Sequence, residues 1–181
     1  MVRTELTIAG VGGQGSILAG VILGTAAVTY DNQYAAQTQA YSSELRGGFA
    51  AAWVVISDTP VMFPRVTKPE ILVAQAQDSI SRYGDAVSKD GVLIIDSDMV
   101  SSLPQGMKHI FKIPATSIAR NEIKVPVTAN MVMLGALCKI TTVVSRQALE
   151  QAVSNAVPKG KEQLNLDAFS LGFEKVSGVK S

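Results

Sequence analysis

The stretch ELTIAGVGGQGSILAG, Glu5–Gly20, holds most of the information about the fold. A short apolar run, Leu6–Ala9, is typical of a buried strand, and an apolar helical pattern covers Ser16–Tyr30. Glycines fill the turn between them. This order predicts a strand, a loop at its carboxyl end and then a helix, which is how many α/β layer folds begin.

The glycine loop matches the G-x-G-x-x-G spacing of the dinucleotide-binding fingerprint. Gly10 permits a tight turn, Gly12 a close backbone approach and Gly15 close helix–strand packing, while the free N–H groups of the helix start can bind an anion. Such a site also needs an acidic residue at the end of the second strand, and Asp31 lies before that strand begins. Nucleotide binding is therefore the alternative. We favour a structural turn or a subunit contact for Gly10, Gly12, Gly13, Gln14 and Gly15.

The composition suits one domain spanning residues 1–181, with 47% hydrophobic residues and a net charge of +1. No Lys/Arg run and no apolar run of about 20 residues is present, so we expect no nucleic-acid partner and no membrane span. The first residues, MVRTELTI, lack a signal-peptide pattern, and a cytoplasmic location is expected. The single Cys and single His exclude an internal disulfide and predict no metal site.

Charged residues make up only 17% of the chain, against about 25% in an average domain. Either another chain covers part of the surface, or the surface is rich in Ser, Thr and Gln. The sequence leaves both interpretations open.

The remaining pattern predicts a three-layer, Rossmann-like α/β/α sandwich with a mainly parallel sheet and one antiparallel hairpin insertion. Apolar and β-branched runs predict strands over residues 34–40, 50–57, 71–74, 92–95 and 108–113. Helical patterns cover residues 16–30, 79–86, 130–140, 146–157 and 164–176, with Ser145 as the expected cap of the fourth helix.

A second loop, Tyr41–Gly48, joins the two strands of the hairpin. It places Glu44 and Arg46 before the paired glycines Gly47 and Gly48, in a segment otherwise poor in charge. The functional interpretation is a docking element, with Arg46 for a carboxylate or phosphate and Glu44 for a partner's donor. The alternative is an exposed hairpin tip with solvated charges. The length and glycine content favour function.

Candidates for direct catalysis are few. His109 lies in a predicted strand without a visible acidic partner, and Cys138 lies among apolar residues of a helix as a packed, inert thiol. Asp96 and Asp98 follow the strand over 92–95, where α/β sites often form, but a turn or a helix cap explains them equally well. We assign no catalytic residue to this chain.

Five motifs in order make the chain recognisable. They are Gly-Val-Gly-Gly-Gln-Gly (10–15), Tyr-Ser-Ser-Glu-Leu-Arg-Gly-Gly (41–48), Ile-Pro-Ala-Thr (113–116), Ala-Asn-Met-Val-Met-Leu-Gly-Ala-Leu (129–137) and Asn-Leu-Asp-Ala-Phe-Ser-Leu-Gly-Phe (165–173). With these motifs in this order, the chain resembles the gamma subunit of 2-oxoacid:ferredoxin (or flavodoxin) oxidoreductases over almost its whole length, and is most similar to the 2-oxoglutarate-specific branch. One departure is Ser42, where the family commonly has Gly after the tyrosine.

The resemblance implies oxidative decarboxylation of a 2-oxoacid with CoA, giving acyl-CoA and CO2, with electrons passing to ferredoxin or flavodoxin. It also implies thiamine diphosphate with Mg2+ and iron–sulfur clusters in the complex. We expect none of these cofactors to be held by this chain alone. An iron–sulfur cluster needs four thiolates, and this chain has one cysteine. A thiamine diphosphate site needs a Gly-Asp-Gly element, and the segment Tyr83-Gly-Asp-Ala86 has alanine in place of the last glycine. The isolated chain is therefore predicted to be inactive.

The resemblance further implies partner subunits of the alpha, beta and delta types, and contact with ferredoxin or flavodoxin through the complex. It places the loops Gly10–Gly15 and Tyr41–Gly48 towards a shared active site, where Gln14, Arg46 and the loop amides would contact substrate or CoA. The apolar helix with Asn130, Met131 and Met133 is then expected at an interface, and the isolated chain could form a homodimer.

Two other functions compete with this one. From the glycine loop alone, the chain would be a free-standing Rossmann-like nucleotide-binding protein or dehydrogenase. It could also be a structural scaffold whose loops never approach the chemistry.

Overall fold

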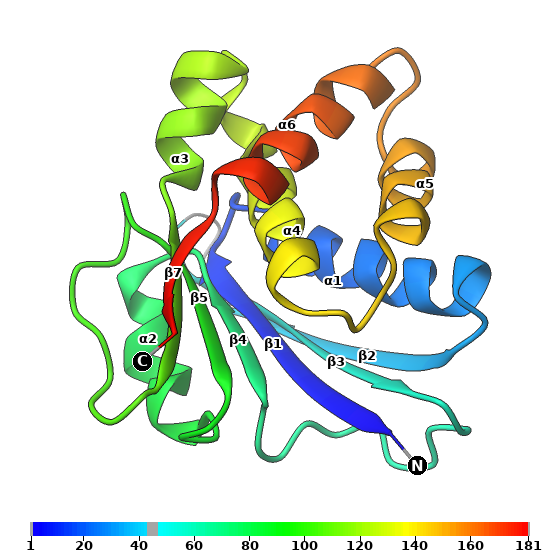
Figure 1. Ribbon diagram of the computed structural model, residues 1–181, viewed down its shortest axis with the longest axis vertical. Helices are drawn as coiled ribbons and strands as arrows, with labels where there is room; N and C mark the ends of the chain where they lie inside the picture. The colour runs from blue at the N-terminus through cyan, green and yellow to red at the C-terminus, as the bar shows by residue number, and fades with distance from the viewer. Residues whose placement is uncertain (1, 43–46, 181) are drawn as a thin grey trace.

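The computed structural model describes residues 2–42 and 47–180 of the chain. Within them, the centre of the molecule is a seven-stranded mixed sheet in the order β2-β3-β1-β4-β5-β6-β7 (Figure 1). The strands are β1 (Arg3–Val11), β2 (Tyr34–Tyr41), β3 (Phe49–Ser57), β4 (Ile71–Ala74), β5 (Val92–Asp96), β6 (His109–Ile113) and β7 (Ser177–Lys180). Strands β1, β4, β5 and β6 run parallel, and β2, β3 and β7 are antiparallel to their neighbours. The predicted α/β fold with an antiparallel hairpin is confirmed.

The helices include the five predicted ones, each within a few residues of its expected position. They are α1 (Ser16–Thr25), α2 (Gln77–Tyr83), α3 (Ala115–Ser117), α4 (Ala129–Ile140), α5 (Arg146–Ala156) and α6 (Glu162–Lys175). Short π-helical turns, η1 (Ala26–Tyr30) and η3 (Ile118–Glu122), continue α1 and α3, and 3-10 turns form η2 (Gly84–Ala86) and η4 (Pro126–Thr128). Strand β7 and the helical turns between residues 115 and 128 were not predicted.

The two faces of the sheet are covered unequally. The larger core lies between the sheet and helices α1, α4, α5 and α6, whereas the smaller core lies beneath α2 (Figure 1). The continuous apolar run of β4 serves both faces, because Ile71 and Val73 enter the larger core and Leu72 and Ala74 the smaller one. This double burial is typical of parallel strands covered on both sides.

Helix α4 is apolar on nearly all sides, and the structure shows why. It is buried from Asn130 to Cys138 between the sheet and α6. The apolar surface of α4 is therefore used inside this chain, which is one of the two outcomes that an all-round apolar helix allows.

The pairing of β1 with β3 positions the candidate site. These strands are antiparallel, with Arg3 opposite Ser57 at one end and Val11 opposite Phe49 at the other. The end of β1 therefore lies beside the start of β3. Because the glycine loop follows β1 and the second loop precedes β3, both loops emerge at the same end of these two paired strands.

Candidate functional site

The two loops singled out by the sequence are joined by a backbone hydrogen bond. The N–H of Gly12 donates to the carbonyl oxygen of Gly48 at 2.6 Å. We call this pair of loops, residues 10–15 and the described residues 41, 42, 47 and 48, the double-loop rim. A groove of about 390 Å³ opens between them, lined by Gly12, Gly13, Gly15, Ser16, Ile17, Tyr41, Ser42, Gly48, Phe49 and Ala50.

Glycine is required at several positions of the rim. Gly13 and Gly15 have φ angles of 95° and 75°, a left-handed conformation that strains any other residue. Gly10 is crowded, since an added β-carbon would overlap Gln14 Oε1 and lie 2.8 Å from Ser16 Oγ. Gly12 differs, because a β-carbon there would lie 3.5 Å from the Gly48 oxygen, an ordinary contact. Chain folding therefore does not require glycine at position 12 for reasons of space.

Gln14 holds the glycine loop in place rather than pointing into the groove. Its Oε1 accepts from the Val11 N–H at 2.8 Å, and its Nε2 donates to the Gln75 carbonyl oxygen at 2.9 Å. The Nε2 of Gln75 in turn donates to the Gln14 carbonyl at 3.2 Å, while Ser16 Oγ donates to Gln75 Oε1 at 2.6 Å. This closed network fixes the loop to the carboxyl end of β4.

Gln75 and Ser16 were not among the predicted site residues. Both are almost completely buried. The sequence around the glycine loop does not point to Gln75. This residue follows β4 and lies 61 positions after Gln14 in the chain. A glutamine directly after a buried strand was the only hint, since buried amides require partners.

The start of α4 also supports the rim. Asn130 Nδ2 donates to the Gly15 carbonyl oxygen at 3.4 Å, and an added β-carbon on Gly15 would overlap the Asn130 amide. Asn130, Met131 and Met133 are buried within the chain, with 3%, 2% and 1% of their surfaces exposed. Side chains so deeply buried offer almost no surface to a partner. The apolar face that suggested an interface helix is instead core, and Asn130 acts on the site from inside.

The second loop is described only in part. Tyr41 is exposed over 67% of its surface, and Gly47 has a φ angle of 76°. Glu44 and Arg46, the two charged candidates, lie outside the described residues, and their roles stay predictions.

Asp31 has a structural role. Its carboxylate accepts from the N–H of Ser145 at 2.5 Å and from Ser145 Oγ at 2.6 Å. Ser145 Oγ in turn accepts from the Ala148 N–H, which confirms Ser145 as the cap of α5. Asp31 therefore ties the end of η1 to α5, away from any ribose-binding position.

Asp96 and Asp98 also cap a helical turn. Asp96 Oδ2 accepts from Thr116 Oγ1 at 2.6 Å and from the Thr116 N–H at 3.1 Å, and Asp98 Oδ2 accepts from the Ser117 N–H at 2.6 Å. Burial raises the pKa of Asp96, although the hydrogen bonds from Thr116 and Asp98 oppose the rise. Of the two interpretations left open by the sequence, the structure shows capping.

The other titratable candidates lie apart from the rim. Cys138 is buried in α4, and burial raises the pKa of its thiol to about 11, so the thiol is protonated at neutral pH. His109 is half-buried at the start of β6. Asp85 of the broken Gly-Asp-Gly element is exposed in η2. Among the described residues, no three His, Cys, Asp or Glu side chains group as metal ligands do.

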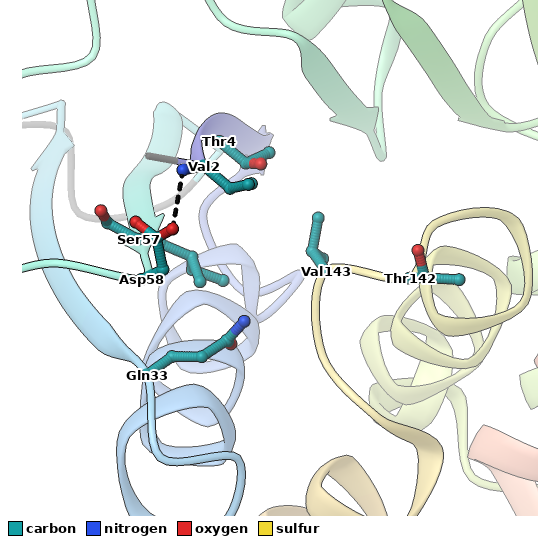
Figure 2. Close-up of a pocket in the computed structure, with 8 residues that line it drawn as sticks. Val2, Thr4, Gln33, Ser57, Asp58, Thr142 and Val143 are labelled. Carbon is teal, nitrogen blue, oxygen red and sulfur yellow. Dashed lines mark hydrogen bonds between the residues drawn. The ribbon is translucent and has the colours of Figure 1, made fainter.

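A second pocket, of about 180 Å³, lies at the opposite end of β1 (Figure 2). The Val2 N–H donates to Asp58 Oδ2 at 3.0 Å on one side, and Thr142 and Val143 form the other side. Gln33 Oε1 is buried here without a hydrogen-bond partner in the described part of the chain. The pocket is small and brings together none of the residues predicted for the site.

The groove at the described part of the rim therefore offers backbone amides, hydroxyls and glycine surfaces beside the apolar side chains of Ile17, Phe49 and Ala50. Its described lining holds no ionisable group other than the Tyr41 phenol. Such a surface can bind an anionic or extended group, or a neighbouring chain, through N–H donors. These described residues supply no side chain suited to general acid–base catalysis near neutral pH. In the same described residues, no helix is long and apolar enough to span a bilayer.

Comparison with known proteins adds to this geometry. The family model described as pyruvate ferredoxin/flavodoxin oxidoreductase matches residues 5–175. The 2-oxoglutarate synthase subunit KorC of Methanocaldococcus jannaschii is 51% identical over 95% of this chain and 93% of its own. The subunit of the same name from Methanothermobacter marburgensis is 45% identical, over 96% and 97%.

A solved structure agrees with the sequence relatives. The gamma subunit of keto/oxoacid ferredoxin oxidoreductase from Geobacter sulfurreducens is 40% identical, with a TM-score of 0.88 and coverage of 97% of both chains. The match therefore extends over the sheet, the double-loop rim and the helices α1, α4, α5 and α6 that cover the larger core. By sequence and by fold, this chain belongs to the pyruvate ferredoxin/flavodoxin oxidoreductase family.

Proposed function

We propose that this chain is the gamma subunit of a 2-oxoglutarate:ferredoxin oxidoreductase. Full-length similarity to KorC subunits supports this function over a free-standing dehydrogenase. The geometry agrees, because Asp31, the acid that would bind ribose, instead accepts hydrogen bonds from Ser145, the cap of α5. Catalysis then belongs to the assembled complex, in which this chain is an accessory subunit.

The single observation that carries the role of the site is the Gly12–Gly48 hydrogen bond. It joins two glycine-rich loops, 36 positions apart, into one rim, whose groove combines glycine backbone and the hydroxyls of Ser16 and Ser42 with apolar side chains. We infer that this rim closes against the shared active site and contacts an anionic group of CoA or of the oxoacid. Its amides donate to such a group without a counter-charge having to be buried.

The cofactors of the reaction do not fit this chain. The only thiol in the sequence is Cys138, and it is buried and protonated. Asp85 stands exposed in a turn that lacks the last glycine of the thiamine diphosphate element. Thiamine diphosphate, Mg2+ and iron–sulfur clusters are therefore assigned to partner subunits of the alpha, beta and delta types. Ferredoxin or flavodoxin would meet the complex there, in the cytoplasm.

The test is a methyl group added to the rim of the reconstituted complex. Gly12→Ala introduces a β-carbon that the chain itself accommodates at 3.5 Å from Gly48. We expect a folded subunit that assembles normally, with kcat/KM for CoA or 2-oxoglutarate reduced about tenfold or more because close approach to the amides is blocked. The control is Gln151→Ala, on the exposed face of α5 and outside both loops of the rim.

The outcomes separate the competing functions. If the complex with Gly12→Ala assembles and turns over at the wild-type rate, the rim is a structural scaffold that does not contact CoA or the oxoacid. Calorimetric binding of NAD or FAD to the isolated chain would favour the free-standing nucleotide-binding protein instead. If the complex turned over pyruvate in preference to 2-oxoglutarate, the proposed substrate would be contradicted. The assignment of this chain as a gamma subunit would stand.

A further inference from the structure

Strand β2 is an open edge of the sheet. Among the described strands only β3 pairs with it, and Figure 1 shows β2 at the border of the sheet, next to α1. The pairing with β3 is continuous from Tyr34 opposite Ser57 to Tyr41 opposite Ala50, without a bulge. The outer backbone groups of a regular edge strand can pair with another strand.

The edge lacks the features that usually prevent such pairing. Its sequence, YAAQTQAY, contains no charge and no proline over Tyr34–Tyr41. Edge strands of folded proteins are normally protected by lysine, proline or bulges. Beside it, the outer face of α1 and of its continuation η1 exposes an apolar stripe of Leu18, Val21 and Val28, with 39%, 44% and 50% of their surfaces open.

The stripe and the edge enclose a shallow groove of about 310 Å³. It is lined by Val21, Gly24, Thr25, Val28, Thr29, Ala35, Ala36 and Gln37. Ala35 and Gln37 lie on the α1 side of the sheet, as their partners Ile56 and Val54 in the larger core show. Tyr41 lies on the same side, because strand side chains alternate with a period of two.

From these features we propose that β2 pairs antiparallel with β2 of a second copy of this chain, about a two-fold axis at Thr38. The residues around Thr38, Ala36-Gln37-Thr38-Gln39-Ala40, read the same in both directions. A two-fold axis there sets Gln37 opposite Gln39 and Ala36 opposite Ala40 of the other copy. A symmetric interface must complement itself, and here it brings no like charges together.

The same register fits side chains on the α1 side. It sets Tyr41 directly opposite Ala35 of the second copy, beside the groove near Gly24, where an added β-carbon would lie 4.0 Å from that of Ala35. Tyr41 is otherwise exposed over 67% of its surface. Each ring thus enters the groove of the other copy, and small residues leave room for it. An exposed aromatic meeting an apolar groove is the usual anchor of an interface.

This inference does not rest on the proposed function. The experiment measures the mass of the purified full chain by light scattering or sedimentation at tens of micromolar. We expect twice the 19.1 kDa of one chain. Thr38→Lys sets two ammonium groups opposite each other on the axis and should weaken the dimer by at least about tenfold. The matched control, Gln151→Lys on the exposed face of α5, should leave the dimer intact.

A cross-link tests the register. Residues directly opposite in an antiparallel pair have Cα atoms about 4.5–5.5 Å apart, within the range that a disulfide spans. Thr38→Cys should therefore give a covalent dimer under mild oxidation, and Gln151→Cys should not. Circular dichroism of each variant confirms that it is folded.

Two results would overturn the proposal. One is a wild-type chain that is monomeric at these concentrations and whose Thr38→Cys variant does not cross-link beyond the Gln151→Cys control. The edge would then be open to a strand of a different protein. The other is a dimer that the folded Thr38→Lys variant retains at unchanged affinity, since the interface would then lie elsewhere.

Discussion

Gly135 of α4 and Gly172 of α6 lie at the crossing of the two helices, and neither position has room for a β-carbon. A β-carbon on Gly135 would overlap the carbonyl oxygen of Phe169, and one on Gly172 would overlap that of Val132. The two backbones are thus in direct contact. This contact lets α6 cover the apolar surface of α4, whose first residues support the double-loop rim through Asn130.

Gly135→Ala is therefore expected to destabilise the chain strongly. The added methyl meets backbone rather than a movable side chain, so the helices must separate, at a cost of at least about 2 kcal/mol in the free energy of unfolding. Urea unfolding followed by circular dichroism measures the change. The matched control is Gly24→Ala in α1, where the nearest atom is 4.0 Å away and Ala is the better helix former. Equal stability of the two variants would contradict the close crossing.

Gln75→Ala should loosen the glycine loop. The substitution leaves Ser16 Oγ without its acceptor and removes the donor to the Gln14 carbonyl, in a buried setting. We expect a loss of about 1–3 kcal/mol in the free energy of unfolding. Faster hydrogen exchange should appear at the Val11 and Gly12 amides, and the exposed Gln151→Ala should show neither effect. Unchanged exchange in Gln75→Ala would mean that the loop does not depend on this network.

The buried carboxyl of Asp96 should make stability depend on pH in a defined direction. Its pKa in the folded chain lies above the ordinary 3.8 because of burial. Between these two values the folded state binds more protons than the unfolded state, so this carboxyl's contribution to stability falls as pH rises through the window. Below 3.8 the contribution is fully present.

The variant Asp96→Asn isolates that contribution. It removes an acceptor for the two Thr116 donors and should cost about 1–3 kcal/mol. The advantage of the wild type over the variant should widen as pH falls towards 3.8, as measured by urea unfolding at a series of pH values. An advantage that narrows on acidification would contradict the raised pKa.

Cys138 should be unreactive in the folded chain. Its pKa is raised from 9.0 to about 11, which lowers the thiolate fraction near neutral pH roughly a hundredfold, and only 9% of the residue is exposed. Labelling with a chromogenic disulfide reagent at about pH 8, just below the ordinary thiol pKa, should be slow in buffer and immediate in denaturant. Rapid labelling of the native chain would show that the packing around Cys138 opens readily.

Local patterns in the sequence were sufficient for the main elements. The strand–glycine–helix order of residues 5–20 predicted β1 and α1, and Ser145 was correctly expected to cap α5. These features depend on hydrogen bonds and side-chain spacing within a few residues. Strand β7 was missed, because it exists by pairing with β6 more than sixty residues away and carries only a short, weak pattern of its own.

The sequence by itself determined the family, the α/β class and the two loops that matter, since each is written in a contiguous motif. Only the tertiary structure decided that the loops share one rim, because this requires β1 and β3 to pair antiparallel. It also decided that Asp96 and Asp98 cap a helical turn, that Asp31 binds the capping residue Ser145, and that α4 is core rather than interface. An apolar helix reads the same whether its own chain or another covers it, and only the position of α6 distinguishes the two.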